Sequence, residues 1–116
     1  MESKKLSKLV IKALEDMKGQ AIVCLDVRKL TQITDYMVVV TGTSSTHIKA
    51  LSDKVIKDIK QAGGSMIGVE GREQSEWVLV DLGGVVVHIM LAPVRALYNL
   101  EDLWNFRLSG SSDLRE

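Results

Sequence analysis

The sequence E-W-V-L-V-D-L-G-G-V-V-V-H-I-M-L at residues 76–91 predicts a β-hairpin. Gly83-Gly84 separates two runs rich in aliphatic residues, and a two-residue hairpin turn needs the positive φ that glycine adopts without steric cost. The register that follows joins three facing pairs: Leu82 with Val85, Val80 with Val87, and Leu79 with His88.

The two faces of this hairpin carry different chemistry, because successive side chains of a strand point to opposite sides. One face is wholly aliphatic, as a core-facing side should be, and consists of Val78, Val80, Leu82, Val85, Val87 and Ile89. The other face mixes an indole, a carboxylate, an imidazole and a thioether, and consists of Trp77, Leu79, Asp81, Val86, His88 and Met90. A solvated face would normally carry Thr, Lys and Glu, so we interpret the second face as a recognition surface.

The length and the charge of the chain limit the number of domains and the kinds of partner that it can bind. The 116 residues, of which 46% are hydrophobic, predict one domain over residues 1–108 and a flexible C-terminal tail over residues 109–116. Lys and Arg number 15 and Asp and Glu number 15, so the formal net charge is zero. Broad electrostatic binding of nucleic acid needs several Lys or Arg contacts to phosphates, so we expect no direct sequence-specific nucleic-acid binding. The zero net charge remains compatible with a protein partner and with a local basic patch on the surface.

The single cysteine, Cys24, lies in A-I-V-C-L, a composition typical of a buried strand. An intrachain disulfide is excluded, and we expect Cys24 to behave as a small hydrophobe in a reducing compartment. The N-terminal residues lack the apolar core of a secretory signal, and no apolar run approaches the ~18 residues of a membrane span. These features predict a soluble cytoplasmic protein.

The rest of the sequence predicts helices and strands in the order α-β-β-α-β-β-β-α. Apolar residues at helical spacing predict two amphipathic helices, Leu6 to Met17 ended by Gly19, and Ile48 to Ile59 ended by Gly63-Gly64. Further strands are expected at Gln20–Val27, Tyr36–Thr41 and Ser65–Val69, and a third helix from Pro93 to about Asn99 with a helical continuation to Trp104. This order predicts an α/β fold with a mixed β-sheet and flanking helices, in which the second helix serves as a crossover.

Trp77 and Tyr98 are candidate binding residues, because Trp and Tyr concentrate energy in protein interfaces. Trp77 either belongs to a recognition surface or simply covers the second face of the sheet. Tyr98 is expected to project away from the packing side of the third helix, which we assign to Leu97, Leu100, and Leu103 or Trp104. A charged rim would come from Glu70-Gly71 and Arg95.

The segment Thr41–Ser45 joins a strand to a helix, and such a junction either caps the helix or presents backbone N–H groups to a phosphate. Nucleotidyl transfer at this junction would need two or three carboxylates at alternate strand positions to hold two divalent metals. The strand-associated carboxylates Asp26, Asp35 and Asp81 each stand alone, so catalysis is the weakest of these hypotheses.

The only two histidines, His47 and His88, do not form a zinc-ligand pattern, and no metal or other cofactor is expected. His88 is a structural or interface histidine, or a general base that Asp81 orients from the same hairpin face. His47, near the start of the second helix, is expected to be a solvated helix residue.

Five segments together resemble the ribosomal silencing factor family, also called iojap-related proteins: G-Q-A-I-V-C-L-D-V, T-D-Y-M-V-V-V-T-G-T-S-S-T-H, G-V-E-G, W-V-L-V-D-L-G-G-V-V-V-H and R-A-L-Y-N-L-E-D-L-W. The resemblance runs from about Leu6 to Trp104. It implies a nucleotidyltransferase-like α/β fold that lacks the catalytic carboxylates, and a protein that is not an enzyme.

The resemblance also implies a partner and a mode of action. Family members bind the large ribosomal subunit through large-subunit ribosomal protein fourteen, block joining of the small subunit and lower translation when nutrients are scarce. The positions of the family interface fall on Trp77 and Tyr98, with Glu70, Asp81, Leu82 and His88 in the surrounding motifs. Leu82 is an exception, because the hairpin register places it on the aliphatic face.

Three further points accompany the resemblance. Gly84 is a departure, since some relatives carry Asp after the first turn glycine. A homodimer of the free protein through the aromatic face is a further hypothesis. The alternative function is a divergent nucleotide-binding or nucleotidyl-transferring enzyme that uses Gly42 to Ser45.

Overall fold

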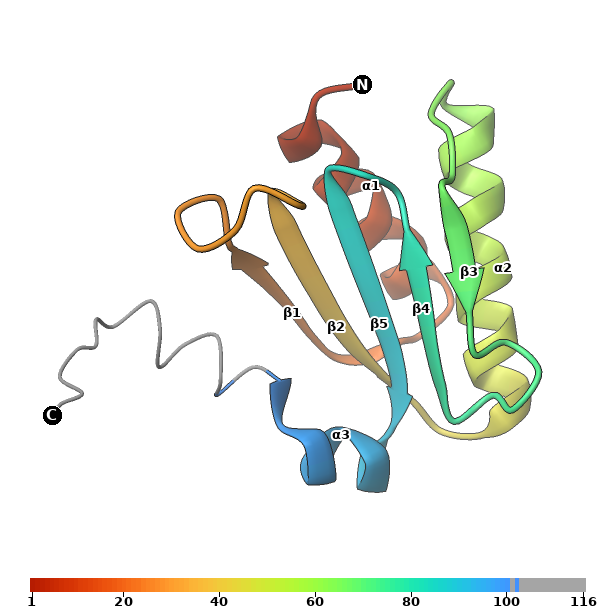
Figure 1. Cartoon of the computed structure of the whole chain (residues 1–116). Helices are drawn as coiled ribbons and strands as arrows, with labels where there is room; N and C mark the ends of the chain where they lie inside the picture. The colour runs from red at the N-terminus through yellow and green to blue at the C-terminus, as the bar shows by residue number, and fades with distance from the viewer. Residues whose placement is uncertain (101, 103–116) are drawn as a thin grey trace, which may run out of the picture.

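The computed structural model describes residues 1–100 and 102, which form a five-stranded sheet with three helices (Figure 1). The elements follow the predicted order: α1 (Ser3–Asp16), β1 (Gln20–Asp26), β2 (Tyr36–Gly42), α2 (Ser45–Gln61), β3 (Gly68–Glu70), β4 (Trp77–Asp81), β5 (Val85–Leu91) and α3 (Ala92–Tyr98). The predicted packing of Leu103 or Trp104 and the tail from Ser109 lie outside the described residues.

The strands are arranged β1-β2-β5-β4-β3. The central pair, β2 and β5, is parallel, and the other three neighbouring pairs are antiparallel. It follows that β3 runs parallel to β2, with β5 and β4 between them, so α2 is the crossover that joins these two strands. The predicted mixed sheet with flanking helices is therefore confirmed.

The β4–β5 hairpin has the predicted register, with Leu79 opposite His88 and Val80 opposite Val87. Gly83 has φ +86°, whereas Gly84 does not have a positive φ, which is the pattern of a type II′ turn. The Gly84 carbonyl accepts hydrogen bonds from the N–H groups of Asp35 and Tyr36, both at 3.1 Å. These bonds tie the hairpin turn to the start of β2.

The aliphatic face of the sheet packs against both α1 and α2, which lie on the same side of it (Figure 1). All six aliphatic residues predicted for this face of the hairpin are buried here, together with the stripes Leu6, Val10, Ala13 and Leu14 of α1 and Ile48, Leu51, Val55 and Ile59 of α2. Each such buried side chain stabilises the fold by roughly 1.5–3 kcal/mol relative to exposure.

The opposite face of the sheet is only partly covered, by a second and smaller cluster of Leu25, Val27, Met37, Val39 and Met90. Leu30 from the β1–β2 loop and Val94 and Leu100 from the α3 region pack against it. Met90 is completely buried, so the predicted recognition surface is smaller than the full hairpin face.

Two sequence predictions about the strands were wrong in part. Cys24 is exposed rather than buried, because β1 is an edge strand and the smaller cluster covers its other side. β3 spans Gly68–Glu70 instead of Ser65–Val69, since its partner β4 ends at Asp81, opposite Gly68. In the described part of the chain, no helix is long and apolar enough to cross a membrane.

The turn before β4 depends on a glycine. Gly71 has φ +81°, and a Cβ there would collide with the carbonyl oxygen of Trp77. The carbonyl oxygen of Gly71 itself accepts the Ser75 N–H at 3.1 Å, so the turn is closed by its own backbone.

We expect Gly71→Ala to lower the free energy of unfolding by at least ~2 kcal/mol, because it combines left-handed backbone with a backbone clash. Gly68→Ala is the matched control, since a Cβ at Gly68 meets nothing within 4 Å. Urea denaturation of both variants measures the difference. Equal stabilities would contradict the proposed constraint on the turn.

Candidate functional site

Three aromatic rings from three elements meet on the partly covered face of the sheet. The Trp77 ring of β4 lies 4.7 Å from the Tyr98 ring of α3 and 5.8 Å from the His88 ring of β5, measured between centroids. Both pairs are tilted, by 49° and 46° respectively, a geometry that the ring quadrupoles favour. Tyr98 is 54% exposed, Trp77 is half-buried and His88 is buried. We call these three residues the aromatic cluster.

The bond between Trp77 and His88 fixes the protonation of the imidazole. The indole Nε1–H of Trp77 donates to Nδ1 of His88 at 3.0 Å. Because the indole nitrogen is only a donor, Nδ1 is unprotonated and Nε2 carries the ring hydrogen. Burial lowers the pKa of His88 from its ordinary value of 6.5 to about 4, so the ring is neutral at pH 7.

The predicted pairing of His88 with Asp81 is wrong. Both Trp77 and Asp81 are diagonal neighbours of His88 across the hairpin, and only a long side chain spans a diagonal. The short carboxylate of Asp81 stays at the turn, where its Oδ1 accepts the Gly83 N–H at 2.9 Å. His88 thus holds the indole, and Asp81 stabilises the turn.

The position of α3 explains why Tyr98 contacts Trp77. Pro93 lies in its first turn, and the αL residue Asn99 follows its end. The guanidinium Nη1 of Arg95 donates to Oγ1 of Thr41 at 2.8 Å, which ties the helix to β2. Val94 packs against the smaller cluster, and Tyr98, four residues later, lies on the same side of the helix.

The sequence prediction for the packing side of α3 was wrong at Leu97, which is 78% exposed, and right at Leu100. A seven-residue helix that starts directly after β5 takes its orientation from its anchors, Val94 and Arg95. This orientation turns Leu97 away from the sheet and Tyr98 toward Trp77.

The other predicted site residues lie at different depths. Glu70 is exposed on β3, opposite Leu79, and Asp81 is half-buried at the end of β4. Leu82 is 6% exposed and lies in the main core, which leaves it little surface for a partner. The structure therefore brings Trp77, Tyr98 and His88 together, with Glu70 and Asp81 on the same face of the sheet.

The Thr41–Ser45 junction is a capped helix start, as the first of the two predictions stated. The Ser44 hydroxyl accepts the His47 N–H at 3.1 Å, and Nδ1 of His47 accepts the Thr43 N–H at 2.9 Å. These two backbone N–H groups are therefore already satisfied within the chain, which weakens the hypothesis of a phosphate site. A Cβ at Gly42 would lie 2.6 Å from Cδ1 of Ile48, so this residue is small because β2 and α2 pack closely.

His47 is not the solvated residue that the sequence suggested. Its Nε2 lies 2.8 Å from the carbonyl oxygen of Met17, and since Nδ1 accepts from Thr43, Nε2 donates this bond. His47 thus links the start of α2 to the end of α1.

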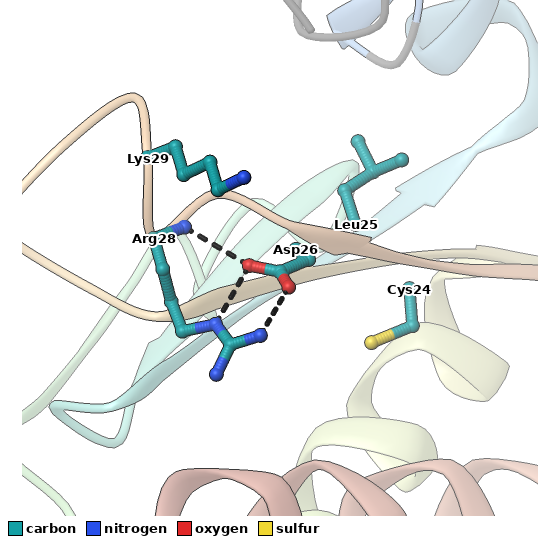
Figure 2. A pocket seen from close by; sticks show the side chains of 5 residues that line it. All are labelled: Cys24, Leu25, Asp26, Arg28 and Lys29. Carbon is teal, nitrogen blue, oxygen red and sulfur yellow. Dashed lines mark hydrogen bonds and ion pairs between the residues drawn. The ribbon is translucent and has the colours of Figure 1, made fainter.

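A hollow of about 640 Å³ lies beside β1, three strand positions away from β4 (Figure 2). Figure 2 shows the guanidinium of Arg28 closing on the carboxylate of Asp26, with Lys29 nearby and Cys24 and Leu25 on opposite sides of the strand. Hydrogen bonds from Arg28 lower the pKa of Asp26 to about 2. Burial, followed by the Asp26 charge, raises the pKa of the Cys24 thiol, which disfavours the reactive thiolate.

This hollow is a weaker candidate than the aromatic cluster. Arg28 and Asp26, two of its three charged residues, form an ion pair with each other, and its thiol is in the less reactive form. Within residues 1–100 and 102, no group of three or more His, Cys, Asp or Glu side chains is placed to hold a metal ion.

We expect the stability of the protein to fall as the pH drops from 6.5 to 4. Over this interval the unfolded chain binds a proton at His88 that the folded chain excludes, which costs roughly 3 kcal/mol in total. Urea denaturation at several pH values measures the slope, and His88→Gln should remove this part of it. Trp77→Phe should keep the slope, since burial is its cause; a slope unchanged in His88→Gln would contradict the assignment.

Comparison with known proteins shows which family this chain resembles. The family model described as "Ribosomal silencing factor during starvation" matches residues 1–115, so the match extends beyond Leu6 and Trp104 at both ends. Ribosomal silencing factor RsfS of Chromobacterium violaceum is 51% identical over 104 residues, which cover 90% of this chain and 85% of that protein. Mouse Mitochondrial assembly of ribosomal large subunit protein 1 is 31% identical over 102 residues, covering 85% of this chain and 45% of that protein.

The fold comparison gives the same result. An X-ray crystal structure of a Chromobacterium violaceum protein superposes with a TM-score of 0.89 at 50% identity, covering 90% of this chain and 88% of that one. The chain therefore belongs to the ribosomal silencing factor family.

Proposed function

We propose that this protein binds the large ribosomal subunit through large-subunit ribosomal protein fourteen and prevents the small subunit from joining, chiefly under nutrient limitation. The observation that carries the proposal is the aromatic cluster, in which Tyr98 is exposed on α3 and Trp77 is partly exposed on β4. The family description names ribosome silencing during starvation, and the name of the mouse relative refers to the large ribosomal subunit.

The aromatic cluster is suited to anchor a protein partner. Trp and Tyr are common hot spots of protein interfaces, since a large rigid ring buries much apolar area at a small cost in side-chain entropy. The His88 bond and the Tyr98 contact already fix the Trp77 ring in the free protein. Binding therefore loses little additional side-chain freedom at this ring.

The proposed silencing mechanism is steric and uses no chemical step. A protein bound at the surface where the subunits meet excludes the small subunit by occupying that surface. We accordingly propose that the protein is not an enzyme and acts in the cytoplasm, where ribosomal subunits join. Self-association of the free protein through the same face stays a prediction.

Trp77→Ala and Tyr98→Ala are each expected to weaken binding to isolated large subunits by roughly 2 kcal/mol, about thirtyfold in Kd, because each removes an anchoring ring. Sedimentation of the purified variants with large subunits measures the loss. Leu97→Ala is the matched control: Leu97 directly precedes Tyr98 on α3 and is more exposed, and it is not one of the proposed ring anchors, so its truncation should leave binding unchanged.

The outcomes separate three cases. Binding of the wild type with loss in both ring variants supports the proposed partner and surface. Binding that survives in both ring variants keeps the ribosome as partner and moves the surface elsewhere. A wild type that does not sediment with large subunits at micromolar concentration contradicts the proposal; thermal melting of each variant shows that the fold is intact.

We also expect the protein to slow the joining of large and small subunits, and light scattering after mixing the two subunits measures this directly. The inhibition should follow the affinity of each variant, so Trp77→Ala should lose it and Leu97→Ala should retain it. Binding without inhibition would show that the protein occupies a surface outside the subunit interface.

A further inference from the structure

An apolar pocket lies next to the aromatic cluster, where residues of the loop that joins β1 and β2 line it. Figure 1 shows the path of this loop. Its volume is about 190 Å³, and its lining consists of Val27, Thr31, Ile33, Thr34, Met37, Val86 and His88. A buried apolar cavity of about 150 Å³ holds a benzene molecule, so this space suits one aliphatic side chain.

Hydrogen bonds within the chain hold the loop over the pocket in place. The Val27 N–H donates to the Asp35 carbonyl at 3.0 Å and closes the base of the loop. The Thr31 N–H donates to the Val27 carbonyl at 3.1 Å, and Thr31 Oγ1 accepts the Ile33 N–H at the same distance. Leu30 packs into the smaller cluster, so the pocket exists before any partner arrives.

Ile33 is the feature that the loop conformation leaves unexplained. It is 86% exposed, more than any other large hydrophobic side chain of the described residues, although it stands on a loop with several ordered backbone bonds. In the sequence it is a lone apolar residue in T-Q-I-T-D, the segment between two predicted strands.

His88 joins this pocket to the aromatic cluster. Its ring lines the pocket and also accepts the Trp77 indole bond, so both sites use the same imidazole. Val86, two residues earlier on β5, lies on the same face of the sheet as His88. The buried His88 ring is therefore the link between the aromatic cluster and the pocket under Ile33.

The charge of the sheet indicates the kind of partner. The five strands contain three carboxylates, Asp26, Glu70 and Asp81, and no Lys or Arg. Glu70 and Asp81 are on the face that carries the aromatic cluster, because their neighbours Val69 and Val80 pack into the main core on the other side. A complementary partner surface is basic and presents an aliphatic side chain.

We infer that the pocket under Ile33 receives an aliphatic side chain from a basic protein surface, the same partner that covers Trp77 and Tyr98. The inference rests on the proposed function and adds a second anchor point to it. Val27, Met37 and Val86 form the apolar lining that contacts the inserted side chain, and Ile33 covers it. Glu70 and Asp81 face the basic residues of the partner.

The test compares two exposed isoleucines. Ile33→Ala is expected to lower the affinity for isolated large subunits, measured by sedimentation, by about fivefold or more. Ile67→Ala should change this affinity by less than about twofold. Ile67 is 70% exposed but lies just before β3, at the other edge of the sheet from β1, so it controls for the loss of a surface isoleucine. Both side chains are exposed, so both variants should fold, which thermal melting checks.

The possible results distinguish this inference from the proposed function. Weakening by Ile33→Ala but not Ile67→Ala supports the pocket. Loss of binding in Trp77→Ala with wild-type affinity in Ile33→Ala overturns the pocket and keeps the aromatic anchor. Weakening by Ile33→Ala with wild-type affinity in Trp77→Ala keeps the pocket and overturns the aromatic anchor. A wild-type protein that does not bind large subunits overturns both.

Discussion

The alternation of side chains along β4 and β5 is the constraint on which the rest of this molecule depends. The Gly83-Gly84 turn sets the register, and a shift of one residue would send the aliphatic set to the solvent and the mixed set into the core. With the observed register, α1 and α2 bury one face while Trp77 and His88 remain on the other. Folding and recognition thus use alternate residues of the same strands, so a substitution in β5 affects one or the other according to its position.

The interaction between Trp77 and His88 couples a buried polar group to an exposed anchor. A neutral imidazole in a buried position needs a partner, and the indole N–H supplies one. The indole in turn gains a fixed orientation beneath Tyr98. The arrangement explains why a histidine occurs on a strand otherwise made of Val, Ile, Met and Leu, where an aliphatic residue would pack as well but could not hold the ring.

Much of the fold could be predicted from the sequence because its signals are local. Helical spacing from Leu6 onward, the Gly83-Gly84 turn and the order of elements each depend on neighbouring residues, and the structure confirmed them. The predicted kinship with nucleotidyltransferases stays a prediction. The details that failed depend on distant contacts: Leu97 is exposed because Arg95 is tied to Thr41 and Val94 packs on the sheet, and His47 is anchored by the carbonyl of Met17.

The candidate site was predicted in part for the same reason. Trp77 and His88 share a hairpin, so their common face follows from alternation alone, whereas the contact between Trp77 and Tyr98 depends on how α3 leaves β5. Trp77 and Asp81 are the two diagonal neighbours of His88 across the hairpin. Only the longer side chain of Trp77 reaches the imidazole, and strand alternation does not reveal this. The pocket beneath Ile33 combines residues of the β1–β2 loop, β2 and β5, and no local pattern indicates it.

The absence of Lys and Arg from the strands has a consequence for how the protein meets a partner. α1 and α2 carry eight lysines and four carboxylates, while the five strands carry three carboxylates, so the charges of these two helices and of the sheet strands have opposite signs. Such a separation is an electric dipole, and the field of a highly charged assembly turns a dipole before contact occurs. The molecule would approach a basic protein surface with its sheet leading and its helices trailing, so that a larger share of encounters begins in a productive orientation, and added salt would diminish this advantage.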